Sequence, residues 1–385
     1  MKKMMNMKNG LSILLFLTLS FAGFAQETEV AKALQPYVDS GEAPGFVTLL
    51  AAKDNILQIN TVGYADVAAK TPMKEDTLFW IASSSKPFAA AAAMILVDEG
   101  KINLDESIAT YLPEFRDLKV AVKNDDGTIL LKKPAKLPTV RQCLSHTGGW
   151  SFLSPYMERF GIDSLPPTRA AGTYAMMFLN YEPGSQYVYS NIGINIGSAV
   201  VERISGQPFD EFMKKRIFEP LGMKETTYVP TSEQVGRIAK SYRYDNEKKS
   251  LQETKIHFLT YPLDDPHIRY AEAGGGIFST APEIVRFFQM LANDGEFQEK
   301  RILSAKSVEE MRTKQTGNLD ASYGLGLGLF GDFYGHGGAY GNDAVIHKPT
   351  GLIAIYMVQV AGVPKQGEAK QQYQKAVLKD MEKFK

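Results

Sequence analysis

The pattern of hydrophobic and polar residues points first to one wholly apolar helix. Residues 89–97 read Ala-Ala-Ala-Ala-Ala-Met-Ile-Leu-Val, so a helix there has no polar face and must be buried on every side. Pro87 lacks a backbone N–H and is tolerated only in the first turn of a helix, which places the helix start at residues 83–85. Gly100 is a typical residue just past a helix end. We therefore predict that the fold is organised around this buried helix.

Strand-like patterns lie mainly toward both ends of the chain, and helical patterns fill the middle. Apolar runs bounded by turn residues predict strands or hairpins over residues 46–52, 56–62, 119–132, 323–330, 344–347 and 352–360. Apolar residues at helical spacing predict helices over residues 27–39, 140–144, 192–204, 208–218, 282–291 and 370–384. Residues 150–187 are rich in aromatic residues, proline and glycine without clear periodicity, and we expect an irregular wall or lid there.

This distribution predicts an α+β fold. An antiparallel sheet is built from both chain ends and flanked by helices, and a mostly helical region is inserted between the two parts. We expect a single domain over residues 26–385. Its α/β part covers about residues 26–82 and 265–385, and the helical insertion covers about residues 83–264.

The first residues have the pattern of a signal peptide. Three lysines in the first eight residues precede an apolar run at 11–21, and Gly-Phe-Ala at 23–25 offers small residues for cleavage. The apolar run is short for a bilayer span, although a retained membrane anchor is the alternative. We predict that residues 1–25 are removed and that the protein is exported to the periplasm or the medium, without stable membrane insertion afterwards.

Composition and charge exclude several classes of partner. Lys and Arg total 43, as do Asp and Glu, so the chain lacks the basic excess typical of nucleic-acid binding. Cys143 is the only cysteine, which rules out an internal disulfide. The histidines lack metal-ligand spacing and the chain has no phosphate-binding glycine loop, so we expect neither a metal nor a cofactor. The oligomeric state cannot be predicted from these patterns.

The start of the predicted buried helix carries two side chains that could take part in catalysis. Ser83 and Lys86 are three residues apart and share one helix face, so their polar groups can meet. A serine hydroxyl needs a neighbouring base to become a nucleophile, and a lysine in a dry site can lose its charge and serve as that base. An ordinary helix cap is the simpler interpretation of these serines, since serine is a preferred capping residue.

Two later motifs add polar groups that could transfer a proton or contact a substrate. Tyr189 and Asn191 stand at the mouth of a predicted helix, where a phenol can transfer a proton and an amide can hold a substrate carbonyl. His336, Gly337 and Gly338 lie at a predicted strand, where glycines permit close approach of a substrate backbone. Taken singly, the first motif is better explained by a capping asparagine beside a packed tyrosine, and the second is equally compatible with a glycine-rich turn.

Three motifs in this order form a stronger signal. Ser-x-x-Lys at 83–86, Tyr-x-Asn at 189–191 and His-x-Gly at 336–338 resemble the serine β-lactamase and penicillin-binding protein superfamily, and most closely its class C β-lactamase-related branch. The likeness extends over about residues 30–360. It includes the segments at 77–79, 144–149, 182–184, 219–223 and 274–280.

The resemblance implies the β-lactamase/transpeptidase-like fold and a role for each motif residue. Ser83 would be the acylated nucleophile, Lys86 would activate it, and Tyr189 would carry protons between the nucleophile, the leaving group and water. Asn191, together with His336, Gly337 and Gly338, would contact the substrate. The backbone N–H groups of Ser83 and of Ala339 would form the oxyanion hole.

The third motif departs from the pattern that lactamases of this family usually have. Lys-Thr-Gly is usual there, whereas this chain has His336-Gly337-Gly338. A lysine is a permanent cation for a substrate carboxylate, while a histidine is mostly neutral near pH 7. The change favours the esterase and peptidase branches over an efficient β-lactamase.

These observations lead to one hypothesis with three alternatives. We expect an exported serine hydrolase that cleaves small ester, amide or peptide substrates through an acyl-enzyme on Ser83. A class C-like β-lactamase, or a D-alanyl-D-alanine carboxypeptidase or D-aminopeptidase, is the alternative within the same chemistry. A hydrolase that pairs Ser83 with His146 is a second alternative, and a non-catalytic binder or sensor on the same fold is the third.

Overall fold

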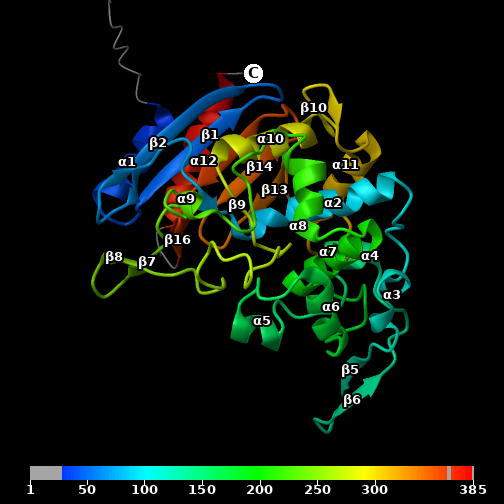
Figure 1. Ribbon diagram of the computed structural model, residues 1–385. Coiled ribbons are helices and arrows are strands. Elements are labelled where there is room, and N and C mark those ends of the chain that lie inside the picture. The colour runs from blue at the N-terminus through cyan, green and yellow to red at the C-terminus, as the bar shows by residue number, and fades with distance from the viewer. Residues whose placement is uncertain (1–27, 362–365, 384–385) are drawn as a thin grey trace, which may run out of the picture.

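The computed structural model describes residues 28–361 and 366–383, so the predicted signal peptide at 1–25 lies outside the described residues. Seven antiparallel strands form the central sheet (Figure 1). In spatial order they are β12 (Gly328–Phe330), β13 (Phe333–Gly337), β14 (Asp343–His347), β15 (Ile353–Met357), β1 (Gly45–Ala51), β2 (Ile56–Asp66) and β3 (Thr71–Pro72). The N-terminal strands therefore pair directly with the C-terminal ones.

Helices cover both faces of this sheet (Figure 1). On one face, α1 (Glu29–Asp39) and α12 (Gln366–Glu382) pack against each other and over the sheet. On the other face lie α10 (Ala281–Ala292) and the helical region of the molecule. All seven residues of β1 are buried, because its alternating side chains enter one hydrophobic core on each face. The sheet with its helices is the α+β arrangement predicted from the sequence.

The apolar helix lies in the middle of the molecule, as predicted. A 3₁₀ turn, η1 (Ala82–Ser85), leads into α2 (Lys86–Asp98), whose residues from Lys86 to Leu96 are all buried. Phe88 stacks on Phe287 of α10 with ring centroids 3.8 Å apart. Gly100 follows the helix with a φ of 70°, the left-handed conformation that glycine adopts without strain.

Helices and small ribbons make up the remaining elements. The helices are α3 (Ile108–Tyr111), η2 (Pro113–Phe115), α4 (Val140–Leu144), α5 (Pro155–Phe160), α6 (Pro167–Ala175), α7 (Asn191–Ser205), α8 (Phe209–Met213), the π-turn η3 (Lys214–Phe218), α9 (Ser232–Val235) and α11 (Ala305–Arg312). The ribbons are β4 (Phe79–Trp80) with β9 (Phe278–Ser279), β5 (Val120–Lys123) with β6 (Ile129–Lys132), β7 (Tyr242–Asp245) with β8 (Ser250–Glu253) and β16 (Val360–Ala361), and β10 (Glu296–Phe297) with β11 (Lys300–Arg301).

Two predictions about local structure are wrong. Residues 150–187 are not irregular throughout, because they contain α5 and α6, and α6 packs on α7 through its buried alanines and Tyr174. Only residues 328–330 of the strand expected at 323–330 are extended. Gly326 adopts a φ of 65°, and a Cβ there would lie 2.6 Å from the carbonyl oxygen of Lys86. This segment bends away from strand geometry because it packs against the first turn of α2.

A buried ion pair joins the loop between α5 and α6 to the segment between β8 and β9. Arg269 Nε donates to Asp163 Oδ2 at 2.7 Å, and both side chains are fully buried. The second carboxylate oxygen accepts the backbone N–H of Thr260 at 2.9 Å, while the guanidinium also donates to the carbonyl of Leu263 at 2.9 Å. Every strong polar group of the pair is therefore satisfied inside the protein, as burial of charges requires.

The described residues contain no helix long and apolar enough to cross a bilayer.

Candidate active site

Ser83 and Lys86 meet at the start of the buried helix, as their spacing predicts. Lys86 Nζ donates to Ser83 Oγ at 3.0 Å and to the carbonyl oxygen of Gly274 at 2.6 Å. Lys86 is fully buried, whereas Ser83 is partly exposed. A hydroxyl that solvent can reach thus stands beside an amine that water cannot solvate.

The backbone immediately before Ser83 has an unusual conformation. Ala82 has a φ of 48°, in the left-handed region that residues with a Cβ seldom adopt. Gly338, the residue just after β13, packs closely against this turn, because a Cβ on Gly338 would lie 2.4 Å from the carbonyl oxygen of Ile81. Only glycine therefore allows the third motif to approach the Ser83 turn this closely.

This contact gives a matched pair of variants. We expect Gly338→Ala to lower the free energy of unfolding by about 1–3 kcal/mol, since overpacking forces the strand or the turn to move. In Gly337→Ala the added Cβ would come no closer than 3.4 Å to its neighbours, so we expect a smaller loss. Urea unfolding of both variants measures the difference, and equal stability of the two would contradict the expected role of Gly338.

Burial disfavours the charged form of Lys86. Desolvation lowers the pKa of the Lys86 amine from 10.5 to about 7, and the nearby carboxylate of Glu272 opposes that change. Glu272 is itself buried, which raises the pKa of its carboxyl above the usual range, and the charge of Lys86 opposes that rise. Near neutral pH the Lys86 amine is therefore available as a base, which an ordinary exposed lysine is not.

Glu272 is a residue that the sequence analysis missed. One carboxylate oxygen accepts the side-chain N–H of Asn195 at 2.8 Å, and Asn195 Oδ1 accepts the backbone N–H of Gly274 at 3.1 Å. The other oxygen is buried without a hydrogen-bond partner in the described structure. Through Asn195, Glu272 thus supports Gly274, whose carbonyl oxygen accepts the hydrogen bond from Lys86. A single acid just before Gly274-Gly275-Gly276, in an apolar stretch, was the available signal.

Tyr189 lies beside both Ser83 and Lys86. The Lys86 ammonium nitrogen is 4.7 Å from the centre of the tyrosine ring. Burial raises the pKa of the Tyr189 phenol well above its usual range, although a hydrogen bond with Ser83 opposes that rise. Its hydroxyl also lies 3.4 Å from His336 Nε2. Tyr189 is therefore a neutral phenol in contact with both other motifs.

His336 is a neutral hydrogen-bond acceptor, which agrees with the expectation that it carries no charge. Its Nδ1–H donates to the carbonyl of Gly337 at 2.7 Å, leaving Nε2 to accept a hydrogen bond from the Tyr323 hydroxyl at 3.0 Å. Burial and the charge of Lys86 lower the pKa of His336 to about 3. The position that is usually a lysine in lactamases of this kind therefore supplies no cation here.

Asn191 and Ala339 stand at the edges of this group. Asn191 is the first residue of α7, and its Oδ1 is buried without a partner in the described structure. The helix is capped by the neighbouring Ser190, whose hydroxyl accepts the N–H of Gly193. Ala339 is exposed just after β13, and its backbone N–H makes no hydrogen bond among the described residues. Each of the two residues therefore has a polar group without a hydrogen-bond partner among the described residues.

His146 does not pair with Ser83. Its Nδ1 accepts the backbone N–H of Ser190 at 3.1 Å, and its Nε2 has no hydrogen-bond partner in the described structure. The ring packs against Tyr189 with centroids 4.4 Å apart. Burial and the charge of Lys86 hold the pKa of His146 well below its usual range. Neither ring nitrogen of His146 therefore bonds Ser83, which contradicts a Ser83–His146 pair. His146 instead binds the backbone next to Tyr189.

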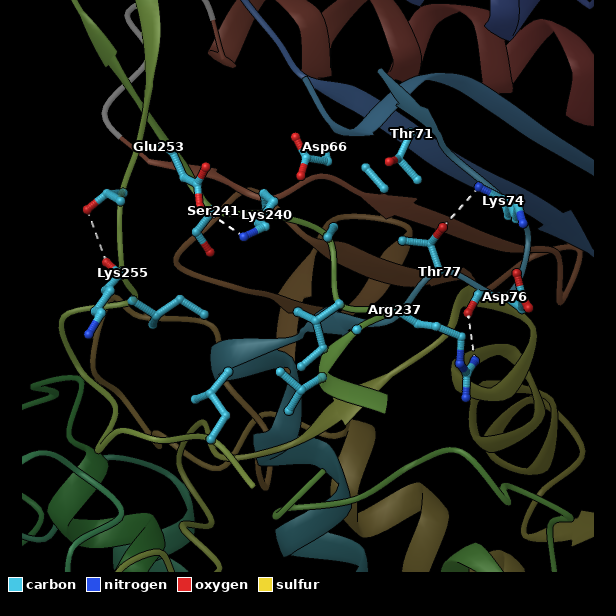
Figure 2. Close-up of a pocket in the computed structure, with 18 of the residues that line it drawn as sticks. Asp66, Thr71, Lys74, Asp76, Thr77, Arg237, Lys240, Ser241, Glu253 and Lys255 are labelled. Carbon is cyan, nitrogen blue, oxygen red and sulfur yellow. Dashed lines mark hydrogen bonds and ion pairs between the residues drawn. The ribbon is translucent and has the colours of Figure 1, made fainter. Parts of the chain in front are cut away.

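Other polar groups of the molecule lie apart from the site. Figure 2 shows residues that line a cavity between the β2–β3 segment and residues 235–263. The volume of this cavity is about 650 Å³. None of the predicted site residues lines it, and charged side chains at its wall pair with each other, as Lys240 does with Glu253 at 3.1 Å. Within the described residues no group of three or more His, Cys, Asp or Glu could hold a metal ion.

The chain is similar in sequence and in fold to known hydrolases. A family model described as Beta-lactamase matches residues 30–379. The esterase EstB of Burkholderia gladioli is 27% identical over 82% of this chain and 86% of its own. A candidate D-alanyl-D-alanine carboxypeptidase of Escherichia coli K12 is 27% identical over 88% of this chain and 83% of its own. The solved structure of EstCE1, a hydrolase with promiscuous acyltransferase activity, superposes with a TM-score of 0.75 at 23% identity, covering 91% of this chain and 97% of that one.

Proposed function

The chain belongs to the β-lactamase family of serine hydrolases, and from this membership we propose that it cleaves small ester or amide substrates through an acyl-enzyme on Ser83. One observation carries the proposal. The Ser83 hydroxyl lies 3.0 Å from a buried lysine whose pKa is lowered to about 7. A base poised near the working pH is what general-base activation of a hydroxyl requires.

Acylation would use these groups in sequence. Ser83 Oγ attacks the substrate carbonyl carbon while its proton passes to the neutral Lys86 amine. The backbone N–H groups of Ser83 and Ala339 stabilise the oxyanion that forms. The bond to the leaving group then breaks, and the Tyr189 phenol donates a proton to the departing oxygen or nitrogen and recovers one from the Lys86 ammonium.

Deacylation would run the same proton transfers in the opposite direction. A water molecule attacks the acyl-enzyme, and its proton passes through Tyr189 to Lys86. The bond to Ser83 Oγ breaks, the carboxylic acid leaves, and Oγ recovers its proton. Tyr189 suits both steps because its raised pKa keeps it protonated between transfers.

Neutral esters fit this site best. The third motif offers the uncharged His336, which accepts a hydrogen bond from the Tyr323 hydroxyl, where a cation for a substrate carboxylate would stand. The likeness to EstB, named as an esterase, supports the same choice. A second candidate activity, on D-alanyl-D-alanine peptides or β-lactams, is favoured by the likeness to the Escherichia coli protein.

A panel of substrates tests the proposal. The protein without residues 1–25 is assayed with a short-chain p-nitrophenyl ester, a D-alanyl-D-alanine peptide and a chromogenic cephalosporin, each beside the Ser83→Ala variant. We expect Ser83-dependent turnover, fastest on the ester. Faster cephalosporin or peptide turnover would move the protein to the second candidate activity. Absence of turnover together with absence of a fluorophosphonate adduct on Ser83 would favour a binder. Export of the protein stays a prediction.

The Lys86–Glu272 pair predicts the pH dependence. Lys86 must be neutral to accept a proton, so kcat/KM rises as pH increases through the pKa of Lys86. The Glu272 carboxylate favours the charged amine and so raises that pKa. In Glu272→Gln this effect is lost, the Asn195 hydrogen bond can remain, and the acid limb of the profile moves to lower pH by about one unit.

A matched control separates this effect from loss of a buried carboxylate in general. Glu283 is also buried, and it accepts the backbone N–H of Glu225 at 3.0 Å, away from the candidate site residues. We expect Glu283→Gln to leave the midpoint of the acid limb unchanged. An acid limb that stays in place in Glu272→Gln would show that Glu272 does not tune Lys86.

A further inference from the structure

The β5–β6 hairpin extends from the helical part of the molecule, and it carries an apolar strand in solvent (Figure 1). Ile129, Leu130 and Leu131 are 63%, 55% and 49% exposed, and no described residue covers the outer edge of β6. Natural proteins seldom leave an apolar edge strand open, because its unpaired backbone groups can bind another strand. This observation is independent of the proposed function.

The hydrogen bonds of the hairpin show which backbone groups are free. Asn124 donates its N–H to the carbonyl of Thr128 at 2.9 Å, and the pairing then alternates along the ribbon. Leu130 therefore bonds with Val122, whereas Ile129 and Leu131 direct their N–H and C=O groups away from β5. Ala121 agrees with this alternation. It lies on β5 opposite Leu131, and its N–H points away from β6 and donates to the carbonyl of Leu179 at 2.8 Å.

We propose that β6 pairs antiparallel with β6 of a second copy of this chain, about a two-fold axis through Leu130. In this register Ile129 faces Leu131 of the other copy, so the outward backbone groups of both copies are satisfied. A two-fold interface uses the same surface patch twice, and this strand is self-complementary in that sense.

The charges around β6 match the same arrangement. Lys133 is exposed one residue past the strand, and Asp125 is exposed in the hairpin turn. Antiparallel pairing about Leu130 brings Lys133 of each copy beside the acidic turn of the other. An anionic lipid surface fits less well, because the Asp125-Asp126 tip of the hairpin would face it. The strand is short, so the dimer is small and reversible.

A cysteine variant tests the register directly. Leu130 would face its own copy as a non-hydrogen-bonded pair, with Cα atoms about 4.5 Å apart, which suits a disulfide. The native Cys143 is buried and does not interfere. We expect Leu130→Cys to form a covalent dimer on mild oxidation, seen on a non-reducing gel. Lys123→Cys, exposed on the other strand of the hairpin, should remain monomeric. Equal cross-linking of the two variants would overturn the register.

Sedimentation of the unmodified protein tests the association itself. We expect the average mass to approach twice the monomer mass as concentration rises, to stay monomeric in Lys133→Asp, and to recover in Lys133→Asp combined with Asp125→Lys. Hydrolytic activity of these variants should match the parent. A monomer at every concentration overturns the proposal. So does a monomer that binds vesicles of anionic phospholipid through the hairpin, which would assign the strand to a lipid surface.

Discussion

Ser83→Ala is expected to lower kcat/KM for the ester substrate by on the order of 10⁴- to 10⁶-fold, as loss of a catalytic nucleophile does. The hydroxyl is the group that Lys86 and Tyr189 both contact, and without it no acyl-enzyme can form. The surrounding N–H groups and the phenol remain, so any residual rate would come from oxyanion stabilisation and binding. Steady-state kinetics measures the loss, and intact mass after reaction with a fluorophosphonate shows whether the adduct disappears.

Ser84 provides the matched control in the same turn. Its hydroxyl is buried and donates to the carbonyl of His336 at 3.0 Å. Ser84→Ala removes one hydroxyl of equal size, and we expect kcat/KM within tenfold of the parent, since a typical hydrogen bond contributes about 1 kcal/mol. A Ser83→Ala protein that hydrolyses the ester as fast as Ser84→Ala would refute the acyl-enzyme.

The second large effect concerns stability. Asp163→Ala is expected to lower the free energy of unfolding by about 3–5 kcal/mol, because it leaves the charge of Arg269 buried without its partner. The variant also removes the acceptor for the backbone N–H of Thr260, so the loop around residues 259–263 loses its anchor. Urea unfolding followed by tryptophan fluorescence measures the change.

Two controls distinguish an orphaned charge from general damage. Asp163→Leu combined with Arg269→Met removes both charges and is expected to recover at least half of the loss, since apolar replacement of a buried ion pair is often neutral. Glu211→Ala breaks an exposed pair with Lys215 and should change stability by less than about 0.5 kcal/mol. If the double variant were as unstable as Asp163→Ala, the charge would not be the cause.

Local chemistry made the central helix and the Ser83–Lys86 pair predictable. A run of five alanines with no polar face could only be buried, and a separation of three residues fixes one helix face whatever surrounds it. Both inferences depend on backbone geometry alone. The hairpin at β5 and β6 was predictable for the same reason, since its turn residues act locally.

The parts that escaped prediction depend on contacts distant in sequence. Glu272 matters because it is buried near Lys86, 186 residues earlier in the chain, and the lone acid in an apolar stretch of sequence does not indicate that neighbour. The helix α6 was missed because Pro166 and Pro167 precede only a short apolar pattern, which gains its meaning from packing on α7. His146 was taken as a candidate base because sequence cannot show which ring nitrogen is already bonded.

The order of strands in the sheet has a consequence for biosynthesis. β1 pairs with β15 through contacts such as Val47 with Met357, so the middle of the sheet cannot close until nearly the whole chain has left the ribosome. Until then both apolar faces of β1 and its open edge remain exposed, the condition in which chains aggregate or are captured by chaperones. Pairing between such distant segments also closes a very long loop, and folding is correspondingly slow. We expect chains truncated before β15 to accumulate as insoluble or chaperone-bound species.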